Sequence, residues 1–288
     1  MTVVPILGAG SSMADYRIGF KWWALIIAVV FVISELVCVA CVPERPVACD
    51  EKPGKISDMF KALFKNDQAM TVVVSIILVY TSLNICGNLV LYFFRFDVGN
   101  EGAYSIFAAV AFAAQVLVMM VIPLLRKRFS KSQLFISGFI IQIAGFAVIL
   151  IMAFAKLYTP QSWYILCLPG ILIYLGYGML NVIMTIFLSD SVDYGEVMNG
   201  TREESVIFSM QTFTVKLASG VAVFLAGLVV DWIHLDTAAA VQIQDTLDAL
   251  RMWMTIPSVI LLIVGIFVFK RFYKLDDTRM EEIKSKLN

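Results

Sequence analysis

The residue in this sequence best suited to chemistry is a lysine inside an apolar segment. Lys216 lies near the middle of the apolar run 206–230. A lysine at the centre of a membrane helix costs about 2.5–3.5 kcal/mol on insertion scales, and from this depth its side chain does not easily reach either surface. We therefore expect Lys216 to face a polar cavity or a carboxylate partner. The other interpretation is a lysine held by hydrogen bonds between helices, without a functional role.

Polar side chains accompany this lysine on the same helix. Ser209, Thr212 and Lys216 are three and four residues apart, so they form one polar stripe on an otherwise apolar helix. Gln211 lies at the edge of this stripe. Polar groups inside a membrane usually line a site or a pathway, and we treat Lys216, Thr212 and Gln211, together with Asn181 of an earlier segment, as candidates for binding a substrate.

Two more apolar segments carry polar stripes. Tyr80, Asn84 and Asn88 are spaced by four residues and share one helix face, and Asn181 follows a run of glycines in a later segment. Asparagines in such positions either line a pathway or hold helices together through hydrogen bonds. The sequence leaves both interpretations open.

Acidic residues gather in one segment, which we expect to be a loop. Residues 189–205 read S-D-S-V-D-Y-G-E-V-M-N-G-T-R-E-E-S. The loop is either simply solvated, or it is an ion-pair gate whose bridges break and reform as the protein changes state. The gate candidates are Asp190, Asp193, Glu196, Arg202 and Glu204.

The sequence offers little for catalysis or metal binding. A single histidine, His234, cannot build a histidine-based metal site, and Cys38 and Cys41 form a C-x-x-C inside an apolar stretch, where small apolar side chains are the simpler interpretation. H-E-x-x-H, G-x-S-x-G and P-loop motifs are absent. We expect no enzyme and no cofactor, and the formal net charge of zero argues against nucleic-acid binding.

The elements that position these residues must be membrane helices. Of the 288 residues, 60% are hydrophobic and only 15% are charged, against about 25% charged residues in an ordinary soluble domain. A helix needs about 20 apolar residues to cross the hydrocarbon of a bilayer. Seven segments qualify: Trp22–Val42, Met70–Phe94, Ala103–Leu125, Gln133–Ala155, Trp163–Leu188, Val206–Val230 and Met252–Phe269.

The basic residues predict the orientation. With seven spans, the lysines and arginines of segments 43–69, 126–132, 189–205 and the tail fall on one side, where they greatly outnumber those on the other side. The positive-inside rule then places the C-terminus in the cytoplasm and the N-terminus outside. Residues 56–65 have helical apolar spacing with lysines between, which predicts a short amphipathic helix on the inner surface.

Residues 190–220 also carry a family resemblance. The stretch D-S-V-D-Y-G-E-V-M-N-G-T-R-E-E-S, followed by F-S-M-Q-T-F-T-V-K-L-A-S-G with its embedded lysine, resembles the glycoside–pentoside–hexuronide:cation symporters, the melibiose permease family within the major facilitator superfamily. K-N-D at residues 65–67, L-Y-F-F at residues 91–94 and G-N at residues 99–100 agree with it. The resemblance covers essentially the whole chain.

The resemblance implies a fold and a set of roles. Family members have twelve helices in two six-helix bundles, and this chain is similar to the sixth helix, the central loop and the C-terminal bundle. By resemblance, Lys216 lies near the sugar and cation sites, Gln211 and Thr212 contribute to the sugar site, and Asp190, Arg202 and Glu204 belong to an inner gate. The coupling cation is expected to be Na⁺ or H⁺, and the location is the bacterial inner membrane.

The expected organisation is an all-α membrane protein in four parts. Residues 1–42 form an N-terminal segment and one span, 43–69 a cytoplasmic loop, 70–272 a six-helix bundle and 273–288 a cytoplasmic tail. The family's cation-binding acidic residues, and most of its sugar-binding ones, lie in the N-terminal bundle, which this sequence lacks. We therefore expect a partial chain that transports a sugar or glycoside only when joined or paired with that half.

Three alternatives remain. A half-transporter could be an assembly subunit, a regulator or an inactive remnant that binds a partner without moving substrate. Seven spans with an outside N-terminus also suggest a receptor, but segment 189–205 and the lysine helix after it fit the symporter pattern better. A membrane enzyme is disfavoured by the missing motifs.

Overall fold

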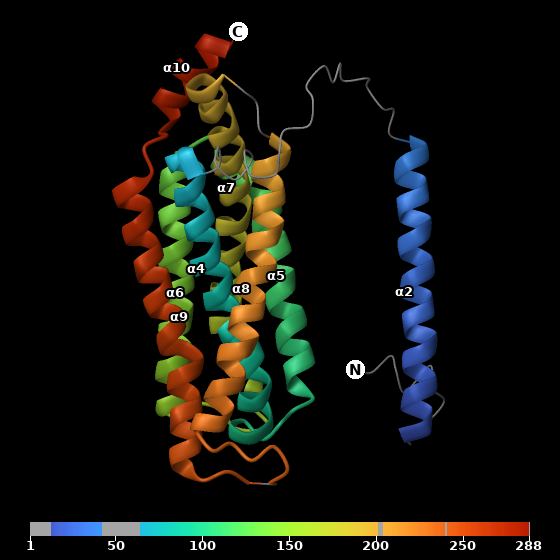
Figure 1. The fold of residues 1–288 in the computed structure, drawn as a ribbon. Coiled ribbons are helices and arrows are strands. Elements are labelled where there is room, and N and C mark those ends of the chain that lie inside the picture. The colour runs from blue at the N-terminus through green and yellow to red at the C-terminus, as the bar shows by residue number, and fades with distance from the viewer. Residues whose placement is uncertain (1–12, 42–63, 201–203, 240, 288) are drawn as a thin grey trace. The chain divides into compact units, whose positions relative to one another are not determined.

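A computed structural model of the protein describes residues 13–41, 64–200, 204–239 and 241–287, where the regular elements are helices (Figure 1). The chain divides into two compact units, residues 1–54 and 55–288. In chain order the elements are α2 (Met13–Cys41), α4 (Asp67–Tyr92), η1 (Phe93–Asp97), α5 (Ala103–Leu125), α6 (Lys131–Phe154), η2 (Trp163–Leu166), α7 (Cys167–Asn199), α8 (Glu204–Trp232), α9 (Gln244–Phe272) and α10 (Asp277–Leu287).

Seven helices of the described chain are long and apolar enough to cross a membrane, which confirms the predicted number of spans. The first unit contributes α2, whose span runs from Arg17 to Cys41 and carries the free cysteines Cys38 and Cys41. The second unit contributes the other six, α4 to α9, and we call it the six-helix unit. The amphipathic helix predicted at 56–65 lies almost entirely outside the described residues.

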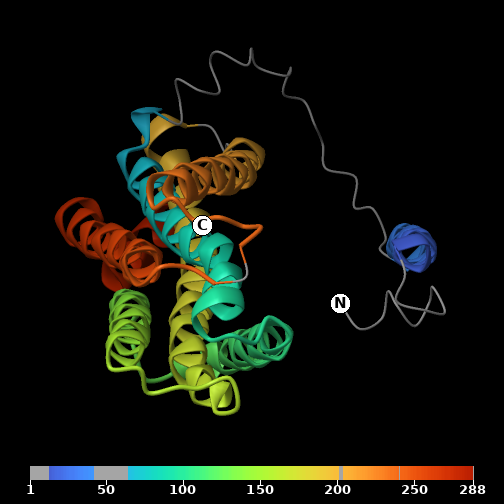
Figure 2. The same cartoon turned by 90° about the horizontal axis from the view of Figure 1, so that it is seen from below.

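Helices α4 and α7 form the centre of the six-helix unit. They are the most buried spans, with 61% and 56% of their apolar windows inside the structure, whereas α5 and α8 reach 22% and 28%. Seen along the helices, α8 and α9 pack on α4, and α5 and α6 pack on α7 (Figure 2). Because lipid does not drive helices together hydrophobically, close packing must hold them.

Glycine allows the closest of these contacts. A Cβ atom at Gly176 of α7 would lie 2.5 Å from the carbonyl oxygen of Gly138 in α6. Only a residue without a side chain lets the two backbones approach so closely. The glycine run before Asn181 therefore serves helix packing at this position.

The segment 189–205, expected to be a loop, is mostly helix. Helix α7 continues to Asn199 and ends at Gly200, whose φ of 73° is left-handed, a common way for a helix to end at glycine. The residues beyond the predicted span stay helical because Tyr194 and Val197 pack against Leu275, Met280 and Ile283 at the C-terminal end of the chain. The predicted end of this helix at Leu188 was wrong, because the helix continues for eleven residues beyond its apolar segment.

A buried ion pair ties together one end of the six-helix unit, which we call the Asp97 end. Arg251 of α9 donates from Nε and Nη2 to both carboxylate oxygens of Asp97, at 2.8 and 2.6 Å, and the two side chains are 3% and 4% exposed. Asp97 also accepts a hydrogen bond from the Tyr158 hydroxyl at 2.7 Å. Burial, followed by the charge of Asp97, raises the pKa of Tyr158, so its hydroxyl stays a donor.

The first prediction concerns this pair. Arg251→Leu leaves the Asp97 carboxylate buried without its partner, which costs about 3–5 kcal/mol of unfolding free energy. Arg95→Leu is the matched control, since Arg95 faces Glu101 at 3.8 Å on the exposed surface, where a pair contributes about 0–1 kcal/mol. Denaturant unfolding of both variants in detergent micelles measures the difference. Equal losses of unfolding free energy in the two variants would contradict the structural role of Arg251.

Candidate functional site

A tyrosine and an asparagine join the two central helices near the middle of their apolar spans. The Asn181 amide of α7 donates to the Tyr80 hydroxyl of α4 at 2.5 Å. The Tyr80 ring also meets the Tyr177 ring edge to face, with centroids 5.5 Å apart. Two of the sequence candidates, Tyr80 and Asn181, are therefore in direct contact.

A threonine that the sequence analysis missed extends these contacts to α8. Thr185 donates from Oγ1 to the Asn181 carbonyl oxygen at 3.2 Å, and the same Oγ1 accepts from the Gln211 amide at 3.3 Å. Polar contacts thus run from α4 through α7 to α8, and we call Tyr80, Asn181, Thr185 and Gln211 the polar chain. Thr185 could have been found from the sequence, because it lies one helical turn after Asn181 and therefore on the same helix face.

The remaining polar candidates bond within their own helices. Asn84 donates to the Tyr80 carbonyl oxygen and Asn88 to the Asn84 carbonyl oxygen, each at 2.7 Å. Thr212 donates to the Phe208 carbonyl oxygen at 3.4 Å. These bonds satisfy side-chain donors in a medium without water, but they join no second helix.

Lys216 lies on the exposed side of α8. Buried neighbours such as Thr214 and Ala218 are on the other side of the helix, where α8 meets α4. Within the described part of the chain, Lys216 has no carboxylate or hydrogen-bond partner. The structure thus leaves a charge facing outward from the six-helix unit, at the depth where a charge is most costly.

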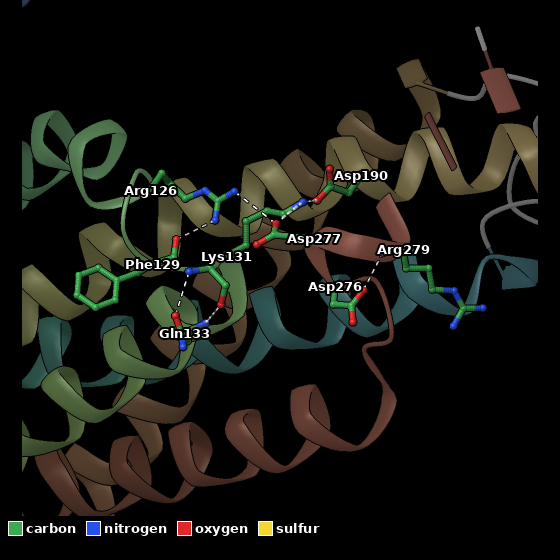
Figure 3. Close-up of polar contacts among 9 residues, drawn as sticks. Arg126, Phe129, Lys131, Gln133, Asp190, Asp276, Asp277 and Arg279 are labelled. Atoms are coloured by element: carbon green, nitrogen blue, oxygen red, sulfur yellow. Dashed lines mark hydrogen bonds and ion pairs between the residues drawn. The ribbon is translucent and has the colours of Figure 1, made fainter. Parts of the chain in front are cut away.

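A second group of charges lies at the opposite end of the unit, which we call the α10 end. The Lys131 ammonium at the start of α6 lies 2.5 Å from the Asp190 carboxylate of α7, and both side chains are almost fully buried (Figure 3). Ser130 and Gln133 form a capping box that begins α6 and fixes Lys131 in the first turn. A buried pair like this is costly to break on one side only.

The C-terminal helix joins this pair. Asp277 in α10 lies 3.4 Å from both Lys131 and Arg126 (Figure 3). Burial works to raise the pKa of Asp277, but the charges of Lys131 and Arg126 outweigh it and hold the pKa below its usual value. We call Arg126, Lys131, Asp190 and Asp277 the ion network.

Only Asp190 of this network is predictable from the sequence. Arg126 and Lys131 there indicate only the orientation in the membrane, and Asp277 carries no signal, because pairing between distant segments leaves no local pattern. Of the other gate candidates, Asp193 and Glu196 lie on α7, and Glu204 lies in the first turn of α8. Arg202 lies outside the described residues.

The comparisons with known proteins decide the family. The family model described as MFS/sugar transport protein matches residues 1–277. The chain belongs to this family. It is therefore a multi-pass membrane protein of a sugar transport family, as the resemblance of residues 190–220 implied.

Named relatives of this MFS/sugar transport chain are symporters and sugar carriers. It is 24% identical to an uncharacterized symporter of Bacillus subtilis (strain 168), over 88% of this chain and 54% of the relative. It is 24% identical to the raffinose carrier protein of Pediococcus pentosaceus, over 99% and 44%, and 25% identical to the isoprimeverose transporter of Lactiplantibacillus pentosus, over 96% and 56%. The chain spans about half the length of these curated relatives.

The second prediction concerns the pH dependence of α10 docking. Because the pKa of Asp277 is lowered, its contribution to docking is complete above the ordinary value of about 4 and is lost as the pH falls through the lowered pKa. A fluorophore on Ser285→Cys, in a variant without the five native cysteines, should show slow rotation at neutral pH and fast rotation in acid. Fluorescence anisotropy measures this change.

Two variants test whether Asp277 causes the effect. Asp277→Asn should give faster rotation than the unchanged chain already at neutral pH, because only the apolar contacts of Leu275, Met280 and Ile283 then hold α10. Asp276→Asn is the control, because among the described residues the Asp276 side chain accepts from the Arg279 backbone N–H alone, and asparagine caps a helix as well as aspartate does. An identical response of both variants would rule out Asp277 as the docking residue.

Proposed function

We propose that this chain forms the C-terminal part of a sugar:cation symporter, in which α8 and the polar chain form one wall of the substrate site. The observation that carries the proposal is Lys216, a mid-membrane charge on the exposed side of α8. A lysine facing lipid would be costly, whereas a lysine facing a water-filled cavity between two bundles is solvated and available to a ligand.

The polar chain supports a ligand rich in hydroxyl groups. Tyr80, Asn181 and Gln211 offer hydroxyl and amide groups that both donate and accept hydrogen bonds. Lys216 and Thr212 would add a cation and a hydroxyl from α8, and Asn84 and Asn88 continue the face of Tyr80 along α4. The relatives named for raffinose and isoprimeverose support a sugar or glycoside as the substrate class.

A second bundle is the partner that this arrangement needs. Alternating access moves one bundle against another around a site near the midplane, and the chain matches about half the length of its relatives. We propose that an N-terminal six-helix half, from the same or a separate polypeptide, covers α8 and supplies the binding groups for Na⁺ or H⁺.

The ion network is the proposed gate. Lys131, Asp190 and Asp277 join α6, α7 and α10 at one end of the site, and breaking such pairs is one way in which a transporter changes state. Asp193, Glu196, Arg202 and Glu204 remain proposed members. The excess of basic residues at this end would place it in the cytoplasm of a bacterial inner membrane.

The third prediction tests the role of Lys216. In cells without other carriers for the tested sugars, expressing the chain from its natural genomic context, Lys216→Ala should reduce cation-coupled uptake of raffinose or isoprimeverose at least about a hundredfold, an effect of roughly 2.7 kcal/mol. Membrane insertion should be unchanged. Leu217→Ala, an exposed neighbour on α8, is the control and should transport normally.

Two other outcomes are informative. Normal uptake by Lys216→Ala would refute the role of this lysine. No uptake even by the unchanged chain, together with co-purification of another membrane protein, would favour an assembly subunit, which the half-length match also allows.

A further inference from the structure

An apolar groove runs along the six-helix unit near the Asp97 end. It has a volume of about 550 Å³, its floor is Ile85 of α4, and its walls are Leu225 of α8 and the middle turns of α9. The wall residues from α9 are Met252, Trp253, Ile256, Pro257, Ile260 and Leu261. A smaller cavity of about 100 Å³ shares Ile85, Leu225, Trp253 and Pro257 and extends the groove to Trp232.

The groove exists because α8 and α9 both pack on α4 rather than on each other. Ile85 is 4% exposed at the bottom, while the wall side chains Leu225 and Ile260 are 37% and 54% exposed. In a membrane such a slot opens sideways into hydrocarbon, and it lies within the spans of α4, α8 and α9.

We propose that this groove is a binding site for one acyl chain of a membrane phospholipid. Every lining residue is apolar, which excludes a sugar or an ion as the occupant. From Met252 to Leu261 the groove is about 13 Å long at 1.5 Å per residue. That length is close to half of a hydrocarbon core about 30 Å thick, the depth of one leaflet.

Two tryptophans mark the place of the lipid headgroup. The rings of Trp232 and Trp253 lie 5.8 Å apart at the Asp97 end of the groove. Tryptophan is enriched at the boundary between hydrocarbon and headgroups. A chain that enters beside this pair would therefore run inward from its own headgroup level.

The lining favours a lipid over another helix. Helices that dock in membranes present small residues to each other, so that the backbones approach closely, and none of the groove residues is glycine, alanine or serine. The groove is also on the far side of α8 from Lys216, because Leu225 follows Lys216 by two and a half helical turns. A second bundle that covers Lys216 would leave the groove open to lipid.

The test uses tryptophan fluorescence of the full chain in detergent micelles. Trp22, Trp23 and Trp163 are replaced by phenylalanine, so that Trp232 and Trp253 alone emit. The probe is phosphatidylcholine with bromine atoms at carbons 6 and 7 of one chain, which quench a tryptophan on contact. The proposal expects quenching that saturates near one lipid per protein chain.

A matched pair of variants identifies the groove as the site. Leu225→Phe narrows it and should weaken the lipid affinity about tenfold. Val223→Phe makes a similar change two residues away on the exposed side of α8 and should leave the affinity unchanged. Quenching that rises without saturation, no quenching, or equal affinities in the two variants would each overturn the proposal.

Discussion

Charged side chains are not hydrated inside the hydrocarbon of a bilayer. This constraint determines how the charged residues of the six-helix unit are paired. At the Asp97 end, Arg251 is paired with Asp97 through two hydrogen bonds, and at the α10 end Lys131 is paired with Asp190. Each pair joins helices far apart in sequence and satisfies charges that could not otherwise be buried. Lys216, by contrast, has no partner among the described residues and points away from the unit.

The buried ion pairs and the exposed Lys216 differ in their surroundings. The two buried pairs tie both ends of a unit in which the central helix α7 packs on α6 through glycine and aromatic contacts. The polar chain reaches α8 at Gln211, and Lys216 lies exposed on the same helix five residues further along the chain.

The seven spans could be predicted from the sequence, because about twenty consecutive apolar residues are typical of a membrane-spanning helix. The prediction misjudged residues 189–199, since the helix there is stabilised by contacts of Tyr194 and Val197 with distant Met280 rather than by its own apolar run. It missed Lys131, Asp277, Asp97 and Thr185, because each depends on a partner from another helix. Lys216, Asn181 and Tyr80 were found because a polar residue inside an apolar run is visible without any structure.

The accessibility of position 216 tests the central claim most directly. In membranes from cells that express the chain in its natural context, Lys216→Cys in a cysteine-free background would be treated with a water-soluble maleimide. The account predicts labelling from the aqueous phase. Position 216 labelled only after detergent solubilisation would mean that it faces lipid or protein, and would contradict a substrate cavity beside α8.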